Sequence, residues 1–293
     1  MSAQTDRWAD MINIKLDELS RESDAPALIT EAIRYSLLSG GKRLRGILTL
    51  AANACLGGDQ EEVLVYACAV EMIHCFSLIH DDLPSMDDDD TRRGKPSSHI
   101  VYGEAMALLA GDALLSLAFE CMLAHALRYP DRLVIHVEAI EQIAAATGSR
   151  GMAGGQCLDL SGVDSYSPDP AIRLKELHSL KTGALFKAAV ASGLILANAT
   201  REQIGAGIRF ASSLGMAFQI RDDILDVIGD PAIMGKRAGM DADKVTWVTL
   251  YGLKGSERAC AAYLDEAECA LDALGGDTSE MLRLVELQRQ RNA

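Results

Sequence analysis

The stretch AMALLAGDALLSLAFECMLAHAL, residues 105–127, indicates how this chain folds. It consists mainly of Ala, Leu and Met, which favour an α-helix. A run of this length can cross a lipid bilayer. However, Asp112 and Glu120 interrupt it, and charged side chains are costly inside a membrane. We therefore expect a buried helix of a globular protein, without stable membrane insertion.

The rest of the chain has the same helical character. Of its 293 residues, 49% are hydrophobic and only seven are proline, and no strand-like alternation is long enough to build a sheet. We predict an all-α fold: a single helical bundle over residues 1–293, able to enclose an elongated apolar cavity. The periodicity predicts helices at 4–19, 25–38, 42–55, 60–83, 99–128, 132–149, 171–195, 201–228 and 257–272.

Charge and cysteine content restrict the partners and the compartment. The net charge of −14 argues against a nucleic-acid partner, because binding would need a basic surface that neutralises phosphates. The seven cysteines are an odd number without CxxC spacing, and no charged-then-apolar leader precedes them. We expect a protein of the reduced cytoplasm.

Two aspartate clusters suggest a metal site. The first lies in HDDLPSMDDDDTRRGKP, residues 80–96, where Pro84 breaks regular helical hydrogen bonding. Asp81 and Asp87 are six residues apart, a rotation of about 240° on an ideal helix. They share a ligand only if the chain unwinds near Pro84, so we predict an irregular turn there.

The second cluster lies in FQIRDDILDVIGD, residues 218–230. Asp222 and Asp226 are four apart on one helix face, where like charges repel unless a cation lies between them. A solvated helix end is the alternative for this cluster alone. Carboxylates without paired Cys or His favour Mg²⁺, which also binds substrate phosphates. A di-iron bundle would need two Glu-x-x-His elements, and Glu71-Met-Ile-His74 is the only copy.

Basic residues near these clusters suggest bound phosphates. In GGKRLR, residues 40–45, two glycines precede a helix start, with Lys42 and Arg45 three apart on one face. An ordinary helix start with surface charges is the alternative, and Arg92 and Arg93 could equally be counter-charges to the aspartates. Together, the acidic and basic motifs suggest two bound anions.

Five motifs together resemble one family. GGKRLR, HDDLPSMDDDDTRRGKP, GGQCLDL, HSLKTGAL and FQIRDDILDVIGD have the order and approximate spacing of the trans-isoprenyl diphosphate synthases. Within that family the chain is most similar to the bacterial farnesyl diphosphate synthases. The resemblance covers nearly the whole chain. It implies an all-α bundle around a deep central cavity, with the aspartate motifs on two helices at its mouth, usually as a homodimer.

The reaction that this resemblance implies joins dimethylallyl and then geranyl diphosphate to isopentenyl diphosphate, head to tail, and releases diphosphate. Mg²⁺, or Mn²⁺ in its place, holds the allylic diphosphate. In this family the released diphosphate is thought to take the final proton, so we name no catalytic base. The resemblance assigns direct metal ligation to Asp81, Asp87 and Asp222, and support of the metals, directly or through water, to Asp82, Asp223 and Asp226.

The basic and polar residues also acquire roles from the resemblance. Negative charge develops on the departing diphosphate, so pre-placed cations lower the barrier to ionisation. The position of His74 in the sequence fits a buried core histidine as well as it fits a residue that binds a ligand. The resemblance implies that Arg92, Lys181 and Lys236 bind the departing diphosphate, with hydrogen-bonding support from Thr182 and Gln219. It also implies that the pocket for isopentenyl diphosphate is formed by Lys42, Arg45, His74 and Arg93.

Product length in this family depends on the residue five before the first motif, which is Phe76 here, beside Ser77. An aromatic side chain there limits chain growth, so we expect farnesyl diphosphate as the product. Geranylgeranyl and geranyl diphosphate are the alternatives. Phe76 lies about 140° from Asp81 around an ideal helix, so a plain core role for Phe76 stays open.

Two features depart from the family pattern. Arg221 stands where Gln is usual, immediately before the second aspartate pair. The loop GKRAGMDADKVTWVTLYG, residues 235–252, is shortened before Lys244 and has Trp247 in place of the usual Tyr. We therefore assign no diphosphate contact to Lys244.

Other classes of protein fit the motifs less well. A class I terpene cyclase also ionises a metal-bound allylic diphosphate, but it needs no second diphosphate pocket such as GGKRLR, His74 and Arg93 suggest. A catalytically silent subunit or a cation-binding scaffold would not need both motifs intact.

Overall fold

The computed structural model describes residues 2–21, 24–162, 169–228 and 245–291, and it confirms the all-α fold. Apart from one short hairpin, the regular elements of these residues are helices. They are α1 Ala3–Leu19, α2 Ala27–Leu37, α3 Leu44–Cys55, α4 Gln60–Asp81, β1 Thr91–Arg92, β2 Lys95–Pro96, α5 Ser98–Tyr102, α6 Glu104–Ala126, η1 Pro130–Arg132, α7 Leu133–Thr147, α8 Met152–Ser161, α9 Pro170–Lys181, α10 Gly183–Leu196, α11 Arg201–Ile228, α13 Trp247–Asp272 and α14 Ser279–Arg289.

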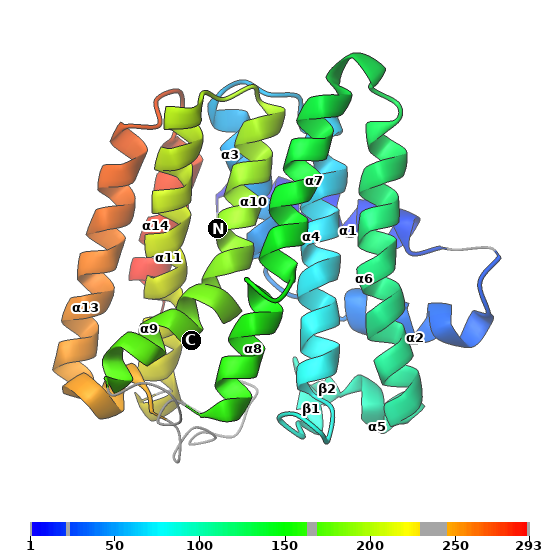
Figure 1. The fold of residues 1–293 in the computed structure, drawn as a ribbon, viewed down its shortest axis with the longest axis horizontal. Coiled ribbons are helices and arrows are strands. Elements are labelled where there is room, and N and C mark those ends of the chain that lie inside the picture. The colour runs from blue at the N-terminus through cyan, green and yellow to red at the C-terminus, as the bar shows by residue number, and fades with distance from the viewer. Residues whose placement is uncertain (1, 22–23, 163–168, 229–244, 292–293) are drawn as a thin grey trace.

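The long helices run side by side, with α13 at one edge of the bundle and α6 at the other (Figure 1). α4 and α10 lie between them, and nearly every residue of α10 is buried. The buried apolar side chains form one contiguous cluster with members from α1 through α14. We expected central helices to be apolar around most of their surface. α10 is such a helix, and neighbouring helices cover it on all sides.

One end of the bundle gathers the polar motifs. The C-terminal ends of α4 and α11, which carry the two aspartate clusters, lie at this end, together with α8, α9 and the hairpin (Figure 1). α9 packs on α8, α10 and α11. The fold thus brings together motifs that lie far apart in the sequence.

Two helices predicted as continuous are each broken in two. The predicted helix 99–128 divides at Gly103, whose φ of +82° cannot continue an α-helix. The predicted helix 171–195 divides at Thr182, and α9 and α10 meet there with a bend of 44°. This bend lies within the HSLKTGAL motif, so it places the half-buried Lys181 and the buried Thr182 at a helix junction rather than along a helix face.

Two helices and a hairpin were missed by the periodicity. α8 contains Gly154 and Gly155, which obscure its helical pattern, and α14 is a short helix beyond the last predicted one. β1 and β2 form an antiparallel hairpin, with Arg93 and Gly94 at positive φ in the turn between them. α13 also begins ten residues before the predicted helix 257–272, at Trp247.

The prediction that residues 105–127 form a buried helix was wrong in part. By length and composition α4 and α6 could each cross a membrane, with a mean hydropathy of 1.7 for both. In α4, 67% of the apolar window is buried in the bundle, but in α6 only 39% is. Among the long helices α6 lies at the edge of the bundle (Figure 1), where it packs on α2, α4, α5 and α7 but leaves apolar side chains such as Leu109 and Leu123 exposed.

Close packing of α8 on α9 depends on Gly155. A Cβ atom at this position would lie 2.1 Å from the backbone nitrogen of Lys181. Backbone atoms cannot move aside as a flexible side chain can. Gly155 therefore sets the distance between α8 and the helix junction at Lys181.

We expect Gly155→Ala to lower the free energy of unfolding by about 1–3 kcal/mol, because the methyl group forces α8 away from α9. Urea denaturation followed by circular dichroism measures this. Gly205→Ala in α11 is the matched control, since its Cβ would meet only the end of the Arg209 side chain at 3.7 Å. That change should stabilise slightly, by up to about 1 kcal/mol. Equal stability of Gly155→Ala and the unmodified chain would contradict the close packing.

Candidate active site

The first aspartate cluster begins where α4 ends. After Asp81 the chain leaves the helix, and the amide of Met86 donates to the carbonyl of Leu83 at 2.8 Å. The amide of Asp87 then donates to the carbonyl of Asp81 at 2.9 Å. The irregular turn predicted near Pro84 is thus confirmed, and it returns Asp87 to the side of Asp81.

Arg92 is held in place by carboxylates. Its Nε atom donates to Oδ1 of Asp82 at 2.9 Å, and its Nη2 atom contacts both Asp82 and Asp89. Burial alone would lower the pKa of Arg92, but the hydrogen bond with Asp82 and the negative charges of Asp82, Asp89 and Asp81 together outweigh burial and raise the pKa. The side chain of Asp82 is only 4% exposed and is engaged by Arg92, so its predicted metal contact stays a prediction.

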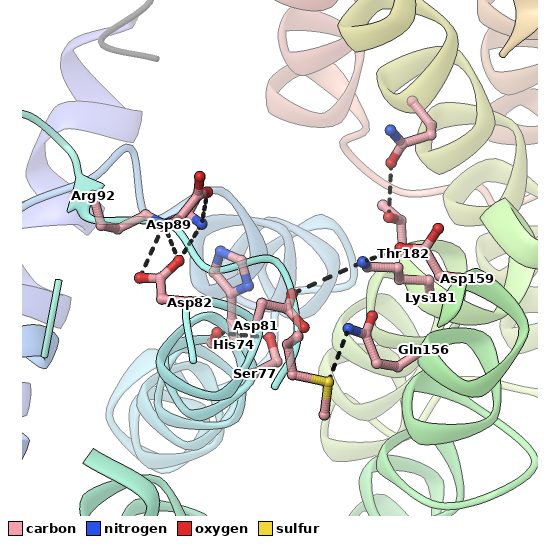
Figure 2. A network of polar contacts seen from close by, with 12 residues as sticks. His74, Ser77, Asp81, Asp82, Asp89, Arg92, Gln156, Asp159, Lys181 and Thr182 are labelled. Atoms are coloured by element: carbon pink, nitrogen blue, oxygen red, sulfur yellow. Dashed lines mark hydrogen bonds and ion pairs between the residues drawn. The ribbon is translucent and has the colours of Figure 1, made fainter. Parts of the chain in front are cut away.

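Lys181, at the end of α9, lies between two carboxylates from different helices (Figure 2). Its Nζ atom is 2.6 Å from Oδ2 of Asp159 and 4.0 Å from Oδ2 of Asp81. Burial raises the pKa of Asp81, and the neighbouring Asp87 adds to this, while Lys181 opposes it. Burial would lower the pKa of Lys181, but Asp81, Asp159 and Asp87 outweigh it and raise the pKa. Lys181 is therefore a charged ammonium group at neutral pH.

α8 contributes two site residues that the sequence reasoning did not assign. Asp159 pairs with Lys181, and Nε2 of Gln156 lies 3.9 Å from the sulfur of Met86 (Figure 2). Both residues belong to GGQCLDL, one of the five motifs that carry the resemblance, to which no residue role was assigned. Their spacing of three on one helix face was the available signal.

A short chain of contacts joins the two aspartate clusters. Thr182, next to Lys181, donates from its hydroxyl to Oε1 of Gln219 on α11 at 2.9 Å. Gln219 precedes Asp222 by about one helical turn. Because Lys181 contacts Asp81, two adjacent residues at the α9–α10 bend link α4 to α11.

The aspartates of the second cluster have different surroundings. Asp222 is partly exposed and pairs with Arg291, at 2.7 Å between Oδ1 and Nη1. Asp223 is buried, and its Oδ2 atom accepts a hydrogen bond of 2.8 Å from the amide of Trp247 at the start of α13. Asp226 is half-buried one turn after Asp222. Asp223 thus fixes a helix start, whereas Asp222 and Asp226 share the face expected to hold metal.

Residues 40–45 are arranged differently from the prediction. α3 begins at Leu44, and Lys42 lies exposed in the turn before it, so Lys42 and Arg45 do not share a helix face as we predicted. The reason is the backbone: Gly41 has a φ of +120° and Arg43 one of +50°. Arg43 is buried and lies 3.8 Å from Glu71, which also accepts the amide of Gly46.

Arg45 and Arg93 lie near His74 and form a cationic group around it. Burial lowers the pKa of Arg45 to about 10, while Glu71 and Asp222 oppose this, and its guanidinium lies 5.0 Å from the ring centre of Phe186. Burial, followed by repulsion from Arg45, Arg93 and other arginines, holds the pKa of His74 well below its usual value. His74 is therefore neutral at pH 7, among arginines that favour a bound anion.

Arg93 also fixes the loop that precedes α3. Its Nη1 atom donates to the carbonyl of Gly40 and lies 3.4 Å from the hydroxyl of Ser39. A Cβ atom at Gly41 would lie 2.8 Å from the Arg93 guanidinium carbon, so only glycine leaves room for it. Gly41 therefore makes room for a cation beside the loop.

Phe76 and Ser77 face different neighbours. The ring centres of Phe76 and His80 are 5.1 Å apart, and Nε2 of His80 is 3.0 Å from the carbonyl of Leu108 on α6. Ser77 lies one turn before Asp81 and donates to the carbonyl of His74 at 2.9 Å (Figure 2). Ser77 thus lies directly below the first aspartate, and Phe76 lies beside it, toward α6.

Lys236 and Lys244 lie outside the described residues, as does most of the loop 235–252. Its end is described: Trp247 is buried, and its indole nitrogen donates to Nδ1 of His178 at 3.2 Å. Burial lowers the pKa of His178 to about 3, so the ring is neutral and accepts this bond. Trp247 in place of Tyr therefore anchors α13 to α9.

Comparisons with known proteins agree with this site. A sequence model of the polyprenyl synthetase family matches residues 26–273. The chain belongs to the polyprenyl synthetase family. It is 45% identical over 287 residues to a chloroplastic geranylgeranyl pyrophosphate synthase of Arabidopsis thaliana, covering 96% of this chain and 78% of that protein.

Two solved structures are similar along their whole length. An FPP/GFPP synthase from Zymomonas mobilis has a TM-score of 0.86 and 34% identity, covering 99% of this chain and 98% of that one. A geranyltransferase from Legionella pneumophila has a TM-score of 0.86 and 35% identity, covering 98% and 96%. The chain is therefore a prenyltransferase of the trans-isoprenyl diphosphate synthase family, as the five motifs predicted.

For a polyprenyl synthetase site, Asp159 is a positioning residue, because it acts through Lys181. We expect Asp159→Asn to lower kcat about tenfold or more, since a misplaced ammonium stabilises the leaving diphosphate less well. Loss of one carboxylate also removes part of what raises the pKa of Lys181. The alkaline limb of the kcat profile should therefore move to lower pH.

Glu176→Gln is the matched control, because Glu176 lies on α9 and is 54% exposed, away from Lys181. It should leave both kcat and the pH profile unchanged. A loss of kcat in Asp159→Asn without any shift of the alkaline limb would show that Asp159 has only a structural role.

Proposed function

We propose that this prenyltransferase condenses an allylic diphosphate with isopentenyl diphosphate in a Mg²⁺-dependent reaction and releases diphosphate. One observation carries the proposal. Asp81 and Lys181, through Thr182 and Gln219, form a continuous acidic and polar wall between α4 and α11. The arginines around His74 form a second, cationic group. The acidic and polar wall suits a diphosphate held by metal ions. The cationic group suits a diphosphate bound without metal.

The donor set fits Mg²⁺. Within the part of the chain that the structure describes, no group of three or more His, Cys, Asp or Glu residues forms a preassembled metal site. Mg²⁺ usually binds one or two carboxylates and completes its shell with water and substrate phosphates. We assign Mg²⁺ to Asp81, Asp87 and Asp222, with Asp82 and Asp226 as supporting residues. Mn²⁺ would bind to the same residues when Mg²⁺ is replaced.

The chain's own cations assist the ionisation step. When the carbon–oxygen bond of the allylic diphosphate breaks, the electron pair and negative charge stay on the departing diphosphate. Bound Mg²⁺ would neutralise much of this charge as a Lewis acid. Lys181 lies at the same wall as a fixed ammonium, and Arg92 is fixed by Asp82 and Asp89. Groups that need no rearrangement during the reaction stabilise charge most effectively.

The second substrate binds at the cationic group. Arg45 and Arg93 can hold the diphosphate of isopentenyl diphosphate, because a guanidinium fork matches phosphate oxygens. Neutral His74 contributes a hydrogen bond rather than a charge. Lys42 lies exposed in the preceding turn, so its contact would require the loop to close over the substrate. The double bond then attacks the allylic cation, and a proton leaves.

The chain length of the product can be inferred from the similar proteins and from Phe76. Most of the similar curated proteins are geranylgeranyl diphosphate synthases, including those of Arabidopsis thaliana and Cyanophora paradoxa. These names favour geranylgeranyl diphosphate over the farnesyl diphosphate that we predicted from Phe76. Farnesyl diphosphate stays the second candidate, because the Phe76 ring lies beside Ser77, which is directly below Asp81, and packs on His80.

We expect purified protein with Mg²⁺, dimethylallyl diphosphate and isopentenyl diphosphate to release diphosphate and to form geranylgeranyl diphosphate. If Phe76 limits growth, the product will instead be farnesyl diphosphate, and Phe76→Ala will lengthen it. Chromatography of the dephosphorylated products measures this. Full activity after thorough chelation, or consumption of farnesyl diphosphate without isopentenyl diphosphate, would contradict the proposed reaction.

The exposed side of α6 supports a homodimer. Leu109 and Leu123 are each 50% exposed, and further apolar side chains continue this face on the neighbouring elements. Obligate homodimer interfaces are apolar in this way. We propose that a second copy covers this face. The apolar surface, called the α6 face below, consists of Ile100, Val101, Leu108, Leu109, Leu123, Leu127, Val134 and Val137.

We expect a dimer in light scattering coupled to size-exclusion chromatography, and Leu123→Glu should shift it toward monomer by burying a charge in the contact. Ile14→Glu on α1 is the control and should stay dimeric, because Ile14 is 63% exposed and is not part of the α6 face. A monomeric unmodified chain, or flotation of the chain with lipid vesicles, would contradict this. None of the seven cysteines, all of which lie within the described residues, forms a disulfide bond, which accords with our proposal of a cytoplasmic location.

A further inference from the structure

The C-terminal segment reaches the second aspartate cluster. Beyond α14, the guanidinium of Arg291 lies 2.7 Å from Asp222, with the two side chains 21% and 34% exposed. The same guanidinium lies 4.6 Å from the ring centre of Phe218, about one turn before Asp222 on α11. Arg291 therefore contacts a carboxylate and an aromatic face on one helix, a geometry that favours a cation.

Arg221 docks the same segment from the other side. Its Nη2 atom donates to the carbonyl of Arg289, the last residue of α14, at 3.4 Å. Carbonyls at a helix C-terminus lack partners within the helix and accept from cations. Arg221 is the residue that departs from the family pattern, so this departure points to the C-terminus rather than to the metal.

We infer that Arg291 is a resident counter-ion of Asp222, which a divalent metal ion must displace. This rests on the proposed function, in which Asp222 is a metal ligand. Oδ1 of Asp222 cannot pair with a guanidinium at 2.7 Å and bind a metal ion in the same direction. Metal binding and docking of Arg291 therefore oppose one another. By linkage, whatever loosens Arg291 strengthens metal binding by the same factor.

A titration with Mn²⁺ tests this, using protein saturated with inorganic diphosphate and free Mn²⁺ measured by electron paramagnetic resonance. Arg291→Gln should bind Mn²⁺ about two- to fivefold more tightly than the unmodified chain, the range for a partly exposed ion pair. Arg283→Gln removes the same charge from α14 without touching Asp222, since Arg283 is 61% exposed and lies beside Glu280. Its affinity should be unchanged.

Hydrogen exchange of a C-terminal peptide gives a second measurement. Mn²⁺ should speed exchange near residues 285–291 in the unmodified chain, but not in Arg291→Gln, where the contact is already lost. Equal Mn²⁺ affinity in Arg291→Gln and the unmodified chain, or an equal gain in Arg283→Gln, would overturn the competition. Failure of every variant to bind Mn²⁺ would instead overturn the metal-dependent reaction on which it rests.

Discussion

The ammonium group of Lys181 between Asp81 and Asp159 is the contact on which the site depends. It lies at the bend between α9 and α10, and it balances carboxylates contributed by α4 and α8. Without it, the two partly buried carboxylates would lose their shared counter-charge, which would favour their protonated forms. The close approach of Gly155 to the Lys181 backbone keeps this arrangement compact.

The fold class was predictable because helical propensity and long apolar periodicity agree along nearly the whole chain. The breaks were not, since they depend on single backbone conformations. Gly103 ends a helix through a positive φ, and Thr182 bends one although its sequence is helix-compatible. α8 escaped notice because glycines that allow close packing also weaken the helical signal.

The site was predictable to the extent that its motifs are local. The turn after Asp81 followed from the spacing of the aspartates around Pro84. The partner of Lys181 and the destination of Arg221 did not follow, because each contact joins segments that only the folded chain brings together. Asp223 differs from the other aspartates of its motif. Its carboxylate accepts a hydrogen bond from the first amide of α13, so it has a structural role that the motif did not indicate.

The neutral state of His74 has a consequence for how the binding pocket responds to its surroundings. An exposed imidazole gains and loses its proton around neutrality, so a pocket that relied on it would change charge with small changes in acidity. Here burial and the neighbouring arginines keep that ring uncharged. Guanidinium groups alone then supply the positive charge that attracts an anion, and this charge stays constant across the acidity range of a living cell.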